Sequence, residues 1–151
     1  MEYIKKYGLP TAIAYPYTAM TGNCKTHVAV NPYAKIADFI RADPRKLEEH
    51  LRFSPLPTDV HAKAELQFYV SGVFETDYCP DGPGDANHGV VIVGHYKDAW
   101  ILRDSAPSSW GLQGHFLMQK GICGIGSTDF ESFEIYNPHQ PKMRRNTYSF
   151  P

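Results

Sequence analysis

The sequence predicts an α+β domain in which a twisted, barrel-like antiparallel β-sheet carries one or two short helices on its outside. The 151 residues include 12 Gly, 12 Pro and 10 Tyr, a composition more typical of a loop-rich, strand-dominated domain than of a helical bundle. Two apolar runs, 90–93 and 100–102, flank the turn Lys97-Asp98 and predict an antiparallel hairpin. A chain of this length favours one domain with a single core.

The N-terminal residues predict a short helix followed by a long loop. Residues 2–7 have the pattern of the last turns of a helix, which Gly8 ends and Pro10 keeps from continuing. The chain is therefore expected to begin inside an element. Residues 15–24 are rich in turn formers and predict a surface loop.

The next predicted elements are a strand, a compact helix and a second strand. Residues 35–40 alternate polar and apolar side chains, as a short strand does. Asp43 and Pro44 provide an N-cap and a first-turn proline for a helix over 43–53, where apolar residues recur at helical spacing. Residues 56–62 are a further strand candidate.

The second half of the chain predicts mostly strands and loops. Residues 66–74 are aromatic and β-branched, as strands are, with Gly72 interrupting them. Residues 79–85 form a loop by their turn residues. Beyond the hairpin, 115–118 and 133–136 predict the remaining strands of the sheet.

The charge balance excludes several classes of partner. The 15 Lys and Arg nearly equal the 16 Asp and Glu, so no surface of the kind that binds nucleic acid is expected. The one local excess of positive charge, in the last ten residues, is interpreted as a solvated end. No apolar run reaches transmembrane length, and Met1 is not followed by the pattern of a signal peptide. We therefore expect no membrane partner and no export signal in this chain.

The three cysteines are an odd number, so in a secreted protein one thiol would be free or paired with another chain. None of Cys24, Cys79 and Cys123 has a helix N-terminus or a cationic neighbour to make it reactive. No Cys and His residues fall at the short spacings of zinc sites. The sequence therefore predicts no metal and no cofactor.

His88 and Asp104 are the candidate catalytic residues. They stand at the start of one strand of the predicted hairpin and at the end of the other, and these two ends are neighbours in an antiparallel pair. The Asp104 carboxylate could then hold the Nδ1 proton of His88 and orient a catalytic base. The alternative is a structural pair, as most such pairs on strands are.

Between residues 2 and 136 the chain carries, in order, seven segments that resemble papain and the cathepsins. They are Tyr3-Ile4 with Gly8, Tyr15-Pro16-Tyr17 through Cys24, Phe68-Tyr69 with Ser71-Gly72-Val73-Phe74, Asn87-His88-Gly89-Val90 with Val93-Gly94, Asp104-Ser105-Ala106, Ser109-Trp110-Gly111 through Gly114, and Gly121-Ile122-Cys123-Gly124-Ile125. Each motif is short, but the ordered set is specific to this family of cysteine peptidases.

The resemblance implies a fold and a set of site residues. Residues 1–24 would be a remnant of the helical first domain, 25–137 a papain-like second, β-rich domain, and 138–151 a C-terminal tail. His88 would be the base and Asp104 the group that orients it. The resemblance also implies a disulfide between Cys79 and Cys123, and substrate-binding roles for Asp59, Asn87, Trp110 and Thr128.

The chain departs from the family pattern in three places. In the family the nucleophilic cysteine lies near the mature N-terminus, roughly 130 or more residues before the histidine, whereas His88 has 87 residues before it. The nucleophile and the glutamine of the oxyanion hole would both belong to a stretch upstream of this sequence. Asp104 stands where the family has asparagine, and Ala106 stands where a tryptophan shields the histidine pair.

Three hypotheses on function follow. The first is a catalytically incomplete homologue, a pseudoenzyme with a structural or protein-binding role in a complex; the changes at Asp104 and Ala106 favour it. The second is the histidine-bearing half of an active papain-like cysteine endopeptidase, a hydrolase that acts in proteolysis, whose Cys-bearing segment is elsewhere. The third is an unrelated small β domain in which His88 and Asp104 are structural.

The first two hypotheses both imply a partner. The missing first domain would leave an apolar surface within residues 2–19, so we expect another protein chain to cover it. A peptide is the expected substrate only if that partner completes the site. Family resemblance implies a lysosomal or secreted protein, but the compartment of this chain stays unknown because it carries no signal peptide.

Overall fold

The structure is a computed structural model that describes residues 1–25, 32–82, 84–126, 130–136 and 138–139, the last strand by its backbone alone. The chain divides into two compact units: the first combines residues 1–39 with 133–151, and the second comprises residues 40–132. Within the described ranges, no helix is long and apolar enough to cross a membrane. The predicted division after residues 24 and 137 stays a prediction.

The first unit begins with the predicted helix, α1 (Glu2–Tyr7). Gly8 ends it with φ 79°, and its N–H donates to the Ile4 carbonyl at 2.9 Å. A Cβ at this glycine would lie 2.5 Å from the Cβ of Pro32, so both the backbone conformation and the space require glycine. Residues 15–24 contain neither helix nor strand, which confirms the predicted loop.

Two strands form a small separate sheet. β1 (Lys35–Arg41) pairs with β7 (Phe130–Tyr136). Both positions were predicted as strands, and both predictions are confirmed. Lys5 of α1 donates to the Asp38 carboxylate of β1 at 2.9 Å, which ties the helix to this strand.

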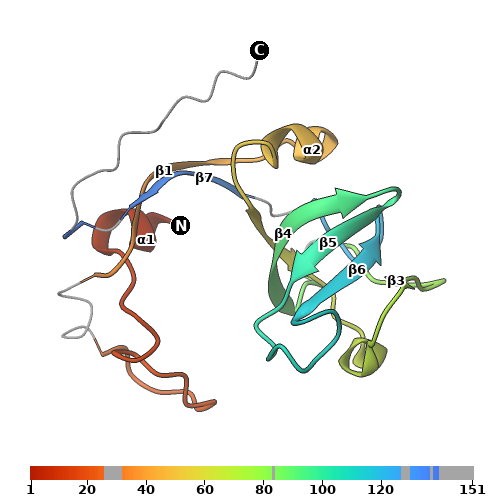
Figure 1. Cartoon of the computed structure of the whole chain (residues 1–151), viewed down its shortest axis with the longest axis horizontal. Helices are drawn as coiled ribbons and strands as arrows, with labels where there is room; N and C mark the ends of the chain where they lie inside the picture. The colour runs from red at the N-terminus through yellow and green to blue at the C-terminus, as the bar shows by residue number, and fades with distance from the viewer. Residues whose placement is uncertain (26–31, 83, 127–129, 137, 140–151) are drawn as a thin grey trace. The chain divides into compact units, whose positions relative to one another are not determined.

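The second unit is built on a five-stranded sheet (Figure 1), with the strand order β2-β4-β5-β6-β3. Its strands are β2 (Leu56–Val60), β3 (Val73–Phe74), β4 (His88–Tyr96), β5 (Ala99–Arg103) and β6 (His115–Gln119). The predicted β4–β5 hairpin is present. All pairings are antiparallel except that of β3 with β6, which is parallel. The whole β4–β5 hairpin lies between β3 and β6 in the chain, so no tight turn forces these two strands to run in opposite directions.

The segment 66–74 is only partly a strand. Residues Ala64–Phe68 form the 3₁₀ helix η3, and β3 follows with two residues. Leu66 and Tyr69 are buried, and the Tyr69 hydroxyl donates to the Gly72 carbonyl at 2.6 Å. The tight turn lets both side chains enter the core, so tertiary burial overrides the strand preference of the segment.

Alternate residues of the central strands make the core of the second unit. Val90 and Ile92 of β4 are buried, and β6 alternates in the same way. β5 buries Trp100 and Leu102 and, in addition, Ala99 at its start. The side chains with less than 2% exposure are Leu56, Val60, Ile92, Leu102, Phe116, Met118 and Cys123. The period-2 burial fixes the register of the strands, because a one-residue slip would turn these side chains to the other face.

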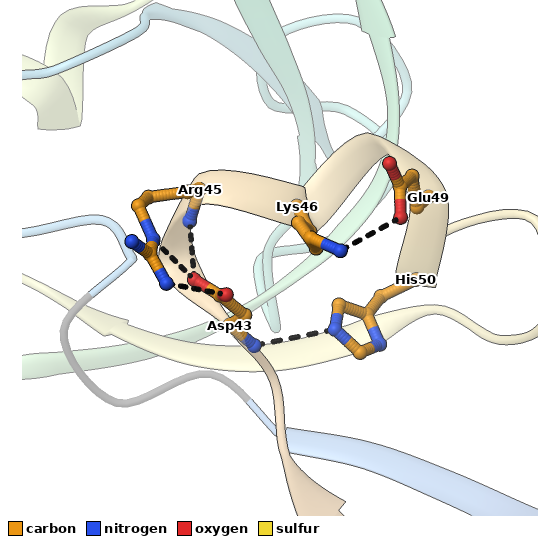
Figure 2. Close-up of polar contacts among 5 residues, drawn as sticks. All are labelled: Asp43, Arg45, Lys46, Glu49 and His50. Atoms are coloured by element: carbon orange, nitrogen blue, oxygen red, sulfur yellow. Dashed lines mark hydrogen bonds and ion pairs between the residues drawn. The ribbon is translucent and has the colours of Figure 1, made fainter.

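The helix predicted over 43–53 is shorter than expected and begins differently. It starts as the 3₁₀ helix η2 (Pro44–Lys46) and continues as one α-helical turn, α2 (Leu47–His50). Figure 2 shows the N-cap: the Asp43 carboxylate accepts the Arg45 N–H at 3.0 Å, while the Asp43 N–H donates to Nε2 of His50 at 3.2 Å. The predicted cap is confirmed, and the bond to His50 draws the segment into a compact turn.

The disulfide that the resemblance implied is present between Cys79 and Cys123. Cys123 is completely buried, and its carbonyl accepts the His61 N–H at 2.9 Å. The bridge therefore ties the segment after β3 to the one after β6 at the edge of the core. Cys24 is exposed and is not in a disulfide.

We predict that the Asp43 cap loses its charge-dependent stabilisation in acid. Hydrogen bonds from the side chain and the backbone of Arg45 lower the pKa of Asp43 from 3.8 to about 2. Because the folded-state pKa is depressed, the stabilisation is complete above the unfolded value and is lost as the pH falls through about 2.

Asp43→Asn keeps the cap acceptor but lacks the charge. In urea unfolding, the wild type should therefore be more stable than this variant at pH 7, and the difference should shrink below about pH 4. Arg45→Ala should reduce the same difference at pH 7. A difference that stays constant down to pH 2 would contradict the assignment.

We predict that removal of the disulfide lowers the free energy of unfolding by about 4 kcal/mol, the loop-entropy estimate for a bridge whose cysteines are 44 residues apart. The test compares a Cys79→Ala, Cys123→Ala double variant with the wild type in urea. Cys24→Ala is the matched control and should unfold like the wild type. A reductant should destabilise the wild type and the control but not the double variant.

Candidate active site

His88 and Asp104 meet at one end of the β4–β5 hairpin. The side chains are joined by a contact of 2.8 Å between Nε2 of His88 and Oδ2 of Asp104. The contact was predicted to involve Nδ1 of His88, and this detail of the prediction was wrong. The register pairs Val91 with Arg103, so Asp104 stands opposite Val90, two residues from His88. His88 and Asp104 are therefore diagonal neighbours across the strand pair, within reach of long side chains.

The Asp104 carboxylate is held from several sides. Its Oδ1 accepts the Ala106 N–H at 2.9 Å, and the Asp104 N–H donates to the Gly114 carbonyl at 3.0 Å. The side chain is only 10% exposed, against 31% for His88. With Oδ2 accepting from Nε2, the ring tautomer leaves Nδ1 as the nitrogen that can take a proton. Within the described part of the chain, no hydrogen bond occupies Nδ1.

A hollow of about 580 Å³ opens beside this pair. It lies wholly within the second unit and is lined by Ala62, Lys63, Ala64, Leu66, Gln67, Asn87, His88, Asp104, Ala106 and Trp110. The structure thus gathers four of the predicted site residues, namely His88, Asp104, Asn87 and Trp110. Of the other lining residues, Ala106 belongs to the predicted segment Asp104-Ser105-Ala106. The remaining five, from Ala62 to Gln67, precede or belong to η3, and no local motif in the sequence marked them as part of a site.

Asn87 forms a wall of the hollow through its side-chain amide. Its Oδ1 accepts the Ala62 N–H at 2.7 Å, and its Nδ2 donates to the Ala62 carbonyl at 3.3 Å. The amide thus pairs with both backbone groups of one residue, as a neighbouring strand would. Asn87 therefore fixes the position of Ala62 next to His88.

Trp110 is equally constrained. Its indole N–H donates to the Gln67 carbonyl at 3.0 Å. The centroid of its ring lies 5.7 Å from that of Tyr69 and 5.7 Å from that of Phe116. An aromatic ring held by a hydrogen bond and two ring contacts offers a rigid face to the hollow.

Two predicted substrate-binding residues are not placed at the hollow. Asp59 lies on β2 opposite Gly89 and is not among the described residues that line it. Thr128 lies outside the described residues. Among the residues that the structure describes, no group of three or more His, Cys, Asp or Glu side chains could hold a metal ion.

Residues 1–133 match the profile of the papain family cysteine proteases. The chain belongs to the papain family. It is 40% identical over 127 residues to cathepsin L 2 of Paramecium tetraurelia, covering 82% of this chain and 38% of that protein. It is 33% identical over 144 residues to cysteine proteinase 1 of Dictyostelium discoideum, covering 87% of this chain and 41% of the relative. The chain thus spans about two fifths of these relatives.

Solved structures of papain-family enzymes have the same fold. The bromelain protease of Ananas comosus, in complex with the inhibitor E64, aligns with a TM-score of 0.68 and 28% identity, over 87% of this chain and 66% of that one. A digestive procathepsin L 3 of Tenebrio molitor aligns with a TM-score of 0.72 and 28% identity, over 88% and 46%. The α+β papain-like fold and the family resemblance that the motifs predicted are both confirmed.

The family loop after Trp110 is built on close backbone approaches. Gly111 has φ 55°, and a Cβ there would lie 2.6 Å from the His115 carbonyl and 3.0 Å from the Tyr69 ring. The Gly114 N–H donates to the Trp110 carbonyl at 2.8 Å. These contacts hold the loop that presents Trp110 to the hollow.

We predict that Gly111→Ala lowers the free energy of unfolding by on the order of 2–4 kcal/mol, because a strained φ and a steric clash add. Gly121→Ala is the matched control: its φ is 82°, but a Cβ there would have no atom within 4 Å. It should cost only the strain, about 1–2 kcal/mol. Urea unfolding measures both, and equal losses would contradict the role of the close contacts.

Proposed function

We propose that residues 1–151 form a papain-family homologue that is catalytically incomplete by itself and has a protein-binding role in a complex. The observation that carries this proposal is that the second unit has no cysteine outside a disulfide. Of three cysteines, Cys79 and Cys123 are joined in a disulfide, so the second unit has the base but no free thiol. A histidine base has no covalent chemistry to perform without a nucleophile.

Cys24 does not replace the nucleophile in this proposal. It is exposed and lies in a loop of the first unit, not at a helix N-terminus, where reactive cysteines are often found. The oxyanion-hole glutamine of the family also has no counterpart that the motifs identify. Loss of either group alone lowers the rate by orders of magnitude.

The changes around His88 support the same proposal. The family asparagine is replaced by Asp104, and the shielding tryptophan by Ala106. The His88 side chain is 31% exposed, so water reaches the pair and weakens its electrostatic interactions. A site under strict catalytic constraint would be expected to keep both family residues.

An apolar surface on the first unit supports a protein partner. A hollow of about 420 Å³ is lined mainly by apolar side chains, and Cys24 also faces it. Nearby in the sequence, Ile13 is 94% exposed and Tyr17 is 93% exposed. Surfaces of this kind mark protein interfaces. We therefore propose that a polypeptide covers the residues Tyr3, Leu9, Pro10, Thr11, Ala12, Tyr15 and Cys24.

The alternative is the histidine-bearing half of an active cysteine endopeptidase, with its nucleophile supplied from outside residues 1–151. The assembled His88–Asp104 pair favours it, because Nδ1 is left open beside the hollow. In that case His88 would first take the thiol proton and then return it to the leaving amine. Asp104 would keep the ring oriented.

We predict that the purified 151-residue chain hydrolyses a fluorogenic peptide amide no faster than its His88→Ala variant, at acidic or neutral pH. Hydrolysis well above that of the variant, blocked by a thiol reagent, would contradict the proposal.

The partner is identified by intact mass of the natural complex without reduction. The alternative would be established by a partner that carries a reactive cysteine, if the complex hydrolyses the peptide, loses this activity with His88→Ala and keeps it with Asp104→Asn.

A further inference from the structure

The disulfide of the second unit lies close to the wall of the hollow, although neither cysteine is among the described residues that line it. The carbonyl of Cys123 accepts the His61 N–H at 2.9 Å. The residue that follows, Ala62, has both of its backbone groups bonded to the side-chain amide of Asn87, at 2.7 and 3.3 Å. Asn87 directly precedes His88. The disulfide is therefore one hydrogen bond and one peptide unit away from the wall beside His88.

The same disulfide anchors the loop that leads into β4. The described residues of 79–87 contain neither helix nor strand. The Gly82 N–H donates to the Asp85 carboxylate at 2.9 Å, and the Asp85 carbonyl accepts from Nδ1 of His61 at 2.8 Å. Without the covalent bond, the loop would depend on hydrogen bonds of this kind to hold it against the segment that carries His61.

The two sulfur atoms differ in their access to a reductant. Cys79 is partly exposed, whereas Cys123 is completely buried. A disulfide is reduced when a thiolate attacks one of its sulfur atoms. An external thiolate therefore reaches Cys79, forms a mixed disulfide with it and expels Cys123 as a thiolate, which takes up a proton. The second thiol of a dithiol then attacks the mixed disulfide, so both cysteines end as thiols and the dithiol ends as a disulfide.

The loop, and not the core, takes up the movement when this bond is cut. Cys123 belongs to the core of the second unit, where close packing leaves little room for displacement. Cys79 lies in the loop, which regains the conformational freedom that a cross-link removes. The freed loop ends at Asn87, so the amide that holds Ala62 is then less fixed.

We propose that the Cys79–Cys123 bridge is a redox switch for the site at His88. A dithiol reductant opens the bridge, frees the loop over 79–87 and releases Ala62 from the side chain of Asn87. Oxidation by a disulfide of the same class restores the wall. The inference goes beyond the proposed function, because the switch acts on the site whether the chain is a binding protein or half of an enzyme.

The test follows the backbone N–H signal of Ala62 in NMR spectra of the oxidised and the reduced chain. A Cys24→Ala background removes the one cysteine outside the bridge. The Asn87→Ala variant marks the position of the Ala62 signal without its acceptor. Reduction with dithiothreitol should move the signal most of the way to that position. In the Asn87→Ala variant, reduction should move it far less, because the coupled bond is already absent.

Leu102, which pairs with Phe116 in the middle of the sheet, is the internal control and should keep its signal. Circular dichroism verifies that each form is folded, and trimethylamine N-oxide is added if the reduced chain unfolds without it. A chain that stays unfolded with this osmolyte would overturn the inference, because the bridge would then support the whole unit rather than switch one site.

An Ala62 signal that does not move, although alkylation labels both thiols, would also overturn the inference. So would an equal shift in the Asn87→Ala variant, since such a shift would be a direct effect of the nearby sulfur atoms. These outcomes are independent of peptide hydrolysis by the chain alone, which is the result that would contradict the proposed function.

A second measurement tests the order of attack. Glutathione, a monothiol, should form its mixed disulfide on Cys79 and leave Cys123 as the free thiol, because only Cys79 of the pair is partly exposed. Alkylation followed by peptide mapping distinguishes the two cysteines. A mixed disulfide found on Cys123 would contradict the route of reduction.

Discussion

The antiparallel pairing of β4 with β5 is the constraint on which the rest of this structure depends. It sets Val91 opposite Arg103 and so brings the start of one strand and the end of the other to the same edge of the sheet. His88 and Asp104 meet there at 2.8 Å. The same register buries Val90 and Ile92, so a slip that displaced the site would also expose the core. Core packing and site geometry are therefore specified together.

Hydrogen bonds between side chains and backbone extend this constraint outwards from the pair. Asp104 binds the backbone of Ala106, Asn87 binds that of Ala62, and Trp110 binds that of Gln67. None of these contacts involves a nucleophile. The walls of the hollow are thus built by the second unit alone, which explains how a papain-family chain can keep the shape of this region without a free thiol in it.

Local patterns made a large part of the fold predictable. The end of α1 at Gly8, the cap at Asp43 and the β4–β5 hairpin each depend on residues only a few positions apart. Contacts between distant segments were much harder to predict. The 3₁₀ turn of η3 forms because Leu66 and Tyr69 enter a core made by other strands, and this burial outweighs the preference of the segment for a strand.

The candidate site, like the fold, was predictable in part from local sequence and in part only from contacts between distant segments. The sequence by itself determined the family, through the order of its motifs, and marked His88 and Asp104 as a candidate pair, because these are properties of the chain. The tertiary structure decided that Asp104 meets Nε2, and that five residues between Ala62 and Gln67 line the hollow while Asp59 is not among the described lining residues. Those outcomes depend on the diagonal offset between paired strands and on which distant backbones come together, and neither quantity is encoded in the spacing of residues along the chain.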